Sequence, residues 1–139
     1  MPPTFPSDSL PWIMARFLWI CLGGAIGTGA RYLLSGWVLR AAGPGFPYGT
    51  LAVNVIGSFL LGLIMQVSLT TGLISPTLRL ALTTGVMGGF TTYSTFNYET
   101  LQFLQEGSWL FGCMNLGITV VACLAAGLLG VVAGRLLAW

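Results

Sequence analysis

One stretch of this sequence concentrates hydrogen-bonding side chains within an otherwise apolar chain. The stretch GVMGGFTTYSTFNYET, residues 85–100, carries a hydroxyl, amide or carboxyl group at every position from Thr91 onward except Phe96. Hydroxyl and amide hydrogens can donate to an anion, and backbone carbonyl oxygens can bind a hard cation. The chain has no His for acid–base work, and its three acidic residues are spread along it. These residues favour ion binding, and we expect no enzyme.

The composition places this stretch inside a lipid membrane. Charged residues make up 6% of the 139 residues and the mean hydropathy is +0.89, whereas a soluble domain carries about 25% charged residues. Long charge-free runs predict an all-α membrane protein. Its four transmembrane helices are expected over residues 17–39, 50–69, 78–105 and 109–137, within one domain over 16–139 that follows an N-terminal tail over 1–15. A net charge of +2 indicates no nucleic-acid partner.

The distribution of basic residues predicts a weakly defined orientation in the membrane. Four spans put both termini on one side, together with Arg16, Arg79 and Arg135, while Arg40 and the neighbourhood of Arg31 fall toward the other. Basic residues near helix ends set topology, and this bias is small, so we expect insertion in both orientations. One short bundle is also too thin to enclose a polar path, which predicts a homodimer, antiparallel if the orientation is mixed.

Glycines spaced four residues apart predict close helix packing. Such pairs let helix backbones approach each other in lipid. They are Gly23/Gly27, Gly85/Gly89 and Gly130/Gly134. The three cysteines fall within predicted helices at spacings that suit neither a zinc site nor a disulfide framework, so we expect them to pack as small apolar residues.

Polar groups cover all faces of the predicted third span, and two conformations would accommodate them. Either Gly88 and Gly89 allow a break followed by Thr91, or the helix is continuous with glycine packing; the residues alone leave both open. Non-helical backbone is tolerated in a membrane where it lines a cavity, and it frees carbonyl oxygens for a cation. Near this point Tyr93 and Phe96 lie on neighbouring helical faces, and their ring edges carry positive partial charge.

Three further groups could contribute to an ion path or only to packing. Asn54 has an NH₂ that could donate to an anion or bond between helices. Glu99 and Arg31 could line a pathway or a vestibule, or interact with the membrane interface at helix ends. In the fourth span Asn115, Thr119 and Cys123 share one helical face and could continue a polar track. The donors outnumber the acids, which favours an anion only weakly.

Three motifs taken together resemble the Fluc/CrcB family of fluoride channels. They are GGAIGTGARY (residues 23–32), GTLAVNVIGSF (49–59) and GVMGGFTTYSTFNYET (85–100), in the family's order and across nearly the whole chain after the tail. The resemblance implies an antiparallel, dual-topology homodimer in the inner (plasma) membrane. It also implies two pores that passively export fluoride from the cytoplasm, and a broken third helix.

The resemblance also assigns roles to individual residues. It implies a structural sodium ion at the dimer interface, held by the backbone carbonyls of Gly88 and Thr91. The pore would be lined by the remaining candidate residues of the three motifs and the fourth span: Asn54, Tyr93, Phe96, Ser94, Thr95, Thr119, Glu99 and Arg31. Tyr93 departs from the family pattern, which usually has Phe at this position.

Two other function classes remain open at this stage. A small dual-topology multidrug or cation exporter would need a membrane-embedded acid in the first span, where this chain has Arg31. A non-conducting subunit of a larger membrane assembly would leave the dense run of hydroxyl and amide groups after Thr91 unexplained.

Overall fold

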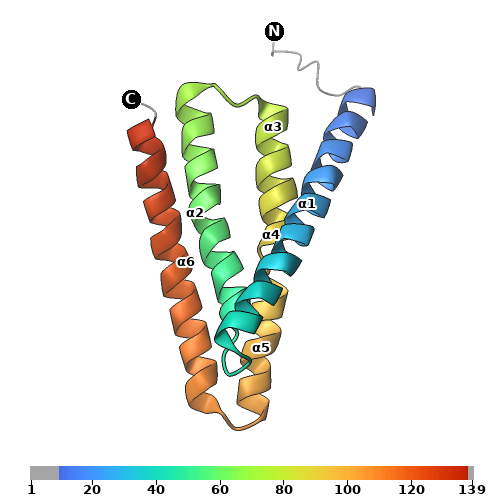
Figure 1. Cartoon of the computed structure of the whole chain (residues 1–139). Helices are drawn as coiled ribbons and strands as arrows, with labels where there is room; N and C mark the ends of the chain where they lie inside the picture. Colours follow the sequence, from blue (N-terminus) through green and yellow to red (C-terminus); the bar gives the residue numbers. More distant parts are fainter. Residues whose placement is uncertain (1–9, 138–139) are drawn as a thin grey trace.

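The computed structural model describes residues 10–137, which are helical apart from short connections (Figure 1). The helices α1 (Leu10–Ala42), α2 (Tyr48–Thr71) and α6 (Trp109–Leu137) are long and apolar enough to cross a membrane. A fourth rod consists of pieces: α3 (Pro76–Leu80), the π-helical segment η2 (Ala81–Met87), the short α4 (Gly88–Phe90) and α5 (Tyr93–Gln105). The expected all-α membrane architecture is therefore confirmed.

The helix bounds agree closely with the expected spans, except at the start of α1. Helix α6 covers the expected residues 109–137, and α5 ends at the expected Gln105. Helix α1 begins at Leu10, so residues 10–15 are helical although we expected them in the tail. Pro11 is compatible with this earlier start because the first helical turn needs no backbone N–H donor. The rest of the expected tail, residues 1–9, lies outside the described residues.

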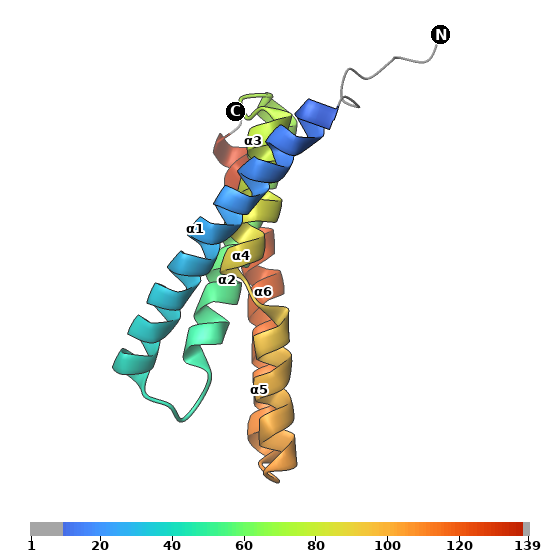
Figure 2. The same ribbon diagram turned by 90° about the vertical axis from the view of Figure 1, so that its right-hand side faces the viewer.

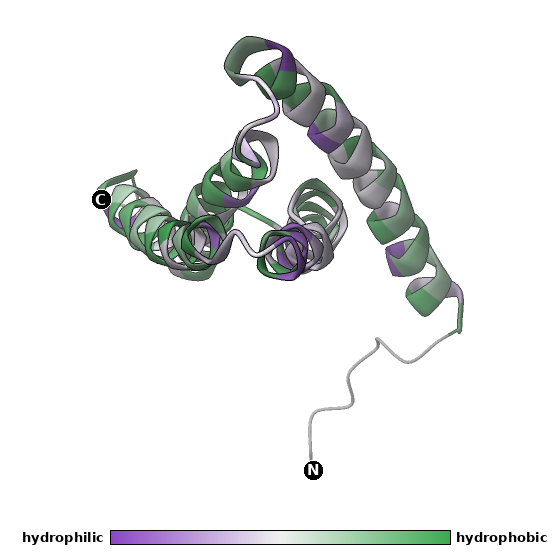
Figure 3. Cartoon of the chain, turned by 90° about the horizontal axis from the view of Figure 1, so that it is seen from below, coloured by the Kyte–Doolittle hydropathy of each residue, from purple (hydrophilic) through white to green (hydrophobic). Residues whose placement is uncertain are grey.

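The fourth rod changes its packing partner along its length. Segments η2 and α4 pack against α1, whereas α5 packs mainly against α6, and α2 and α6 pack along each other. Figure 2 shows the upper part of this rod beside α1 and α5 beside α6. Seen along the bundle in Figure 3, α1 diverges from the other helices. The point where the partner changes is the short connection between α4 and α5.

Glycines make these close contacts possible, as the sequence predicts. A Cβ atom on Gly23 would lie 2.6 Å from the carbonyl oxygen of Ala81, and one on Gly85 would lie 2.8 Å from that of Ile20. The glycine pair of α1 therefore faces the pair of η2 and α4 with almost no room for side chains. Between α6 and α2, a Cβ on Gly130 would overlap the carbonyl oxygen of Phe59.

The described chain ends lie at the same end of the bundle, as four spans require (Figure 1). Arg135 is in the last turn of α6 and Arg79 is in α3, both at that end, whereas Arg40 is in the last turn of α1 at the other. Most large apolar side chains on α1 and α6 are exposed, which suits helices that face lipid or a second protein.

Candidate ion pathway

Two residues in extended conformation separate α4 from α5. Thr91 has φ −85° and ψ 161°, and Thr92 has φ −151° and ψ 110°. In an α-helix the N–H of residue 92 would donate to the carbonyl of residue 88. Here the Thr92 N–H donates instead to Oδ1 of Asn54 on α2, at 2.7 Å. The Gly88 carbonyl thereby loses its helical partner.

Asn54 binds both backbone groups of Thr92. While Oδ1 accepts from the Thr92 N–H, Nδ2 donates to the Thr92 carbonyl at 3.0 Å. A side-chain amide has two N–H groups, so one hydrogen on Nδ2 is left for another acceptor. Asn54 thus supplies the hydrogen bonds that the backbone of Thr92 does not make with a helix. The sequence predicted that Asn54 either donates to an anion or forms an interhelical hydrogen bond, and this geometry allows both at once.

The carbonyl of Thr91 is likewise diverted from helical bonding. The Thr92 hydroxyl caps α5 by accepting from the Thr95 N–H at 3.2 Å, and that N–H would otherwise reach Thr91. The Thr91 carbonyl instead accepts from Nη1 of Arg31 on α1, at 3.2 Å. A carbonyl oxygen has two lone pairs, so a second ligand can still reach it. Arg31 therefore contacts the connection between α4 and α5.

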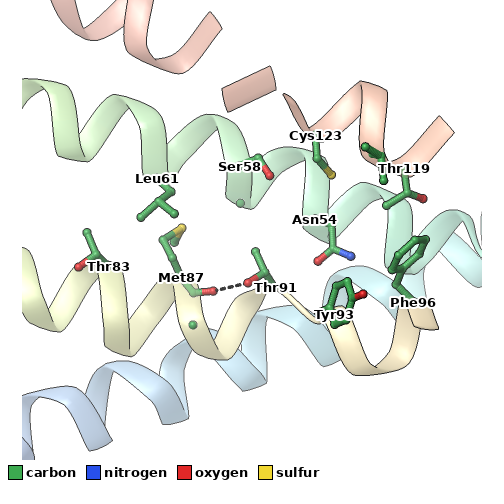
Figure 4. A pocket seen from close by; sticks show the side chains of 13 residues that line it. Asn54, Ser58, Leu61, Thr83, Met87, Thr91, Tyr93, Phe96, Thr119 and Cys123 are labelled. Atoms are coloured by element: carbon green, nitrogen blue, oxygen red, sulfur yellow. Dashed lines mark hydrogen bonds between the residues drawn. The ribbon is translucent and has the colours of Figure 1, made fainter. Parts of the chain in front are cut away.

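A cavity of about 360 Å³ lies beside this connection, between α2, the divided rod and α6 (Figure 4). Asn54 and Thr119 contribute an amide and a hydroxyl to its wall, and Ser58 and Thr83 contribute further hydroxyls. Of the residues proposed from the sequence, this cavity brings together Asn54, Gly88, Thr91, Tyr93, Phe96 and Thr119. Its lining includes no acidic residue.

Tyr93 and Phe96 form one end of this cavity. Their ring centroids are 5.8 Å apart with the planes at 57°, and Figure 4 shows both rings near Asn54 and Thr119. Phe96 is 5% exposed, whereas Tyr93 is 77% exposed, so most of the Tyr93 side chain is not covered by other residues of this chain. Tilted aromatic rings can direct their positive edges toward a small anion.

Glu99 lies in a different cavity from these aromatic residues. One of its carboxylate oxygens accepts from the Thr50 hydroxyl at 2.7 Å, while the other is buried without a hydrogen bond among the described residues. This second cavity, of about 270 Å³, is lined by Glu99, Glu106 and residues of the α1–α2 connection such as Phe46. Sequence reasoning missed Thr50, although its place one helical turn before Asn54 put it on the same face of α2.

Ser94 and Thr95 do not line the cavity beside Asn54. Both are exposed, and their hydroxyls lie 3.5 and 2.9 Å from the Thr92 hydroxyl. Asn97 and Tyr98 are exposed on the same segment. One surface of α5 therefore presents polar and aromatic groups that no other described helix of this chain covers.

The three cysteines are free, and they do not pack inside this chain as the sequence predicted, since Cys21 and Cys113 are exposed and Cys123 is half-buried. Cys123 lines the cavity beside Asn54, one helical turn beyond Thr119. Within residues 10–137 no three His, Cys, Asp or Glu side chains gather in a way that could hold a metal ion. Any cation at the α4–α5 connection would therefore depend on uncharged oxygens such as backbone carbonyls and hydroxyls.

Comparison with known proteins gives a consistent result over most of the chain. A family model described as "CrcB-like protein, Camphor Resistance (CrcB)" matches residues 18–131. A protein of Sorangium cellulosum (strain So ce56) named "Fluoride-specific ion channel FluC" is 63% identical over 122 residues, which cover 88% of this chain and 96% of that protein.

Two further relatives carry the same name. The protein of Anaeromyxobacter dehalogenans (strain 2CP-1 / ATCC BAA-258) is 60% identical over 81% of this chain and 90% of its own length. The protein of Geobacter metallireducens (strain ATCC 53774 / DSM 7210 / GS-15) is 51% identical over 88% of this chain and 98% of its own length. The similarity therefore spans these relatives almost from end to end.

Proposed function

The chain belongs to the CrcB family, and on this premise we propose that it is a fluoride-specific channel whose path runs through the cavity beside Asn54. It is a multi-pass protein of the inner (plasma) membrane and not an enzyme. The observation that carries the proposal is the cavity wall, where an amide, hydroxyls and two aromatic rings converge without any acid. Fluoride would leave the cytoplasm passively along this path.

The chemistry of the wall suits a small, strongly hydrated anion. Fluoride can leave its water shell only where donors replace it, and a polar group inside a membrane is stable where it faces a partner or a cavity. The second N–H of Asn54, the Thr119 hydroxyl and the ring edges of Tyr93 and Phe96 lie close together there. The nearest acid of the same rod, Glu99, lines the other cavity and would meet the ion only beyond the aromatic rings.

We propose that two copies assemble as an antiparallel, dual-topology homodimer with two pores. The uncovered face of α5 supports this assembly, since its hydroxyl, amide and phenol groups would otherwise contact lipid. A second copy related by a two-fold axis would cover this face with the same segment, and exposed Tyr93 would then contribute to a wall that both copies build. The weak charge bias between the two ends of the bundle is compatible with either insertion.

A structural sodium ion at the dimer axis is the second part of the proposal. The carbonyls of Gly88 and Thr91 would hold it, because both lack a helical N–H partner next to the extended residues. Hard cations prefer such oxygens, and Gly88 is exposed in the single chain. The Arg31 guanidinium occupies one lone pair of the Thr91 carbonyl and leaves the other.

Fluoride flux from liposomes tests the channel proposal. Purified protein in liposomes loaded with potassium fluoride should release fluoride when valinomycin provides a path for potassium, and should release much less chloride under the same gradient. Protein-free liposomes provide the control. The absence of fluoride release from liposomes that contain folded protein would refute the proposed function.

Labelling of one terminus tests the dual topology. A protease-cleavable tag after the C-terminus should be cut in about half of the molecules in sealed inverted vesicles, because a small charge bias leaves both orientations populated. Cleavage of all molecules after detergent treatment is the control. Complete cleavage, or complete protection, in sealed vesicles would rule out mixed insertion.

The flux measurement also decides between the proposal and its alternatives. A proton-coupled exporter of cationic drugs would need an acid within its binding cavity, and the cavity beside Asn54 has none among its lining residues. A non-conducting subunit would release no ion at all.

A further inference from the structure

A buried polar network connects α5 and α6 behind the proposed path. Asn115 on α6 is 1% exposed, which makes it one of the two most deeply buried large side chains of the described residues. Its Nδ2 donates to the Thr100 hydroxyl on α5 at 2.9 Å, and the Thr100 hydroxyl donates to the Phe96 carbonyl at 2.8 Å. The Thr119 hydroxyl donates to Oδ1 of Asn115 at 3.4 Å.

This network begins and ends at residues of the cavity wall. Phe96 and Thr119 both line the cavity beside Asn54, whereas Asn115 and Thr100 do not. The sequence placed Asn115 on one face with Thr119 and Cys123 as a possible third member of a polar track. The structure instead puts it between α5 and α6, where it has no access to the path.

The network leaves one N–H of Asn115 without a partner among the described residues, and it contains one weak bond. Asn115 donates once and accepts once, and Thr100 accepts once and donates once, so the hydroxyl hydrogens have defined directions. The bond from Thr119 to Asn115 is long at 3.4 Å and therefore weak. The Thr119 hydrogen can leave it at little cost and turn toward an anion in the cavity.

We propose that Asn115 is a positioning residue for permeation. It fixes the turn of α5 that carries Phe96 against the turn of α6 that carries Thr119, and it holds the Thr119 hydrogen when no anion is near. This inference rests on the proposed fluoride channel, since it gives Asn115 a role only if Phe96 and Thr119 contact the ion. A purely structural role would affect stability alone, whereas a positioning role affects flux in molecules that remain folded.

A double-mutant cycle on fluoride flux tests this role. We expect Asn115→Leu and Thr100→Val each to lower flux per folded dimer by about tenfold or more, because either change separates the two sides of the wall. In the double variant flux should fall no further than in the more affected single variant, because both changes break the same hydrogen-bond network. Thr100→Ser, which keeps the hydroxyl, should conduct within about twofold of wild type.

The control variant changes a buried hydroxyl outside this network. Ser68→Ala on α2 removes a buried hydroxyl that has no hydrogen-bond partner among the described residues, and it should leave flux unchanged. If Asn115→Leu fails to fold, Thr100→Val alone tests the role of the network, because valine has nearly the shape of threonine. The inference would be overturned if the folded single variants conducted like wild type, or if their effects multiplied in the double variant. Neither result would affect the channel proposal, which depends on conduction by the wild-type protein.

Discussion

Replacement of Asn54 by Asp is expected to lower fluoride flux by at least about a hundredfold. The change keeps an oxygen for the Thr92 N–H but removes the donor to the Thr92 carbonyl and places a negative charge in the cavity wall. Two like charges about 4 Å apart repel by roughly 4 kcal/mol at an effective dielectric constant near 20. A barrier increase of about 1.4 kcal/mol corresponds to a tenfold loss of rate. The liposome assay measures the loss directly.

The matched control makes the same amide-to-acid change elsewhere on α2. Gln66 lies three helical turns beyond Asn54 and does not line the cavity, so Gln66→Glu should conduct within about twofold of wild type. Comparable flux in Asn54→Asp and wild type would show that the ion does not pass Asn54. Equal losses in both variants would show that any new acid in α2 prevents folding or assembly.

The position of Asn54 also connects the two ion sites that we propose. By accepting from the Thr92 N–H, it releases the Gly88 carbonyl, and the same side chain lines the cavity with one N–H that Thr92 does not use. A single side chain thereby stabilises the extended backbone that both sites require. Loss of the anion path and loss of a cation site would consequently occur together in variants that remove this amide.

Much of the helix layout was predictable because it depends on local sequence. The charge-free runs and turn-forming connections locate α6 and the end of α5 to the residue. The glycine pairs of α1 and η2 predict close packing because only glycine allows backbones to approach so nearly. The start of α1 was missed because Pro11 follows a polar, proline-rich segment, although residues 10–15 are as apolar as the span and a proline is compatible with the first helical turn.

The partners within the site could not be predicted, because tertiary packing decides them. Asn54 and Thr92 are 38 residues apart and Thr50 and Glu99 are 49 apart, so no local pattern links either pair. The motifs placed Ser94 in the same group as Phe96, but a separation of two residues on α5 turns the side chains about 200° apart. Ser94 is therefore on the uncovered face, whereas Phe96 lines the cavity. The π-helical geometry of residues 81–87 likewise has no signature in the sequence ALTTGVM.

Replacement of Gly27 by Ala is expected to destabilise the protein by about 2–3 kcal/mol or more and to abolish flux. A Cβ atom at this position would overlap the carbonyl oxygen of Val86 and lie 2.9 Å from the backbone nitrogen of Phe90. Both neighbours are backbone atoms, so relief requires α1 to move away from η2 and α4, and overpacking of this kind typically costs about 1–3 kcal/mol. The movement would also withdraw Arg31, one turn further along α1, from the Thr91 carbonyl. Thermal unfolding in detergent and flux in liposomes measure the two effects.

Gly29 provides the matched control because it lies on the same helix, and a Cβ atom added there would meet no described atom within 4 Å. Alanine favours a helix over glycine by roughly 0.5–1 kcal/mol, so Gly29→Ala should unfold at the same temperature as wild type or slightly higher. The two variants share one chemical change and differ only in what the added methyl group meets. If both were equally stable, α1 would not pack on the divided rod at Gly27. If Gly29→Ala alone were destabilised, the face of α1 that carries Gly29 would instead be the tightly packed one, in contact with the second copy.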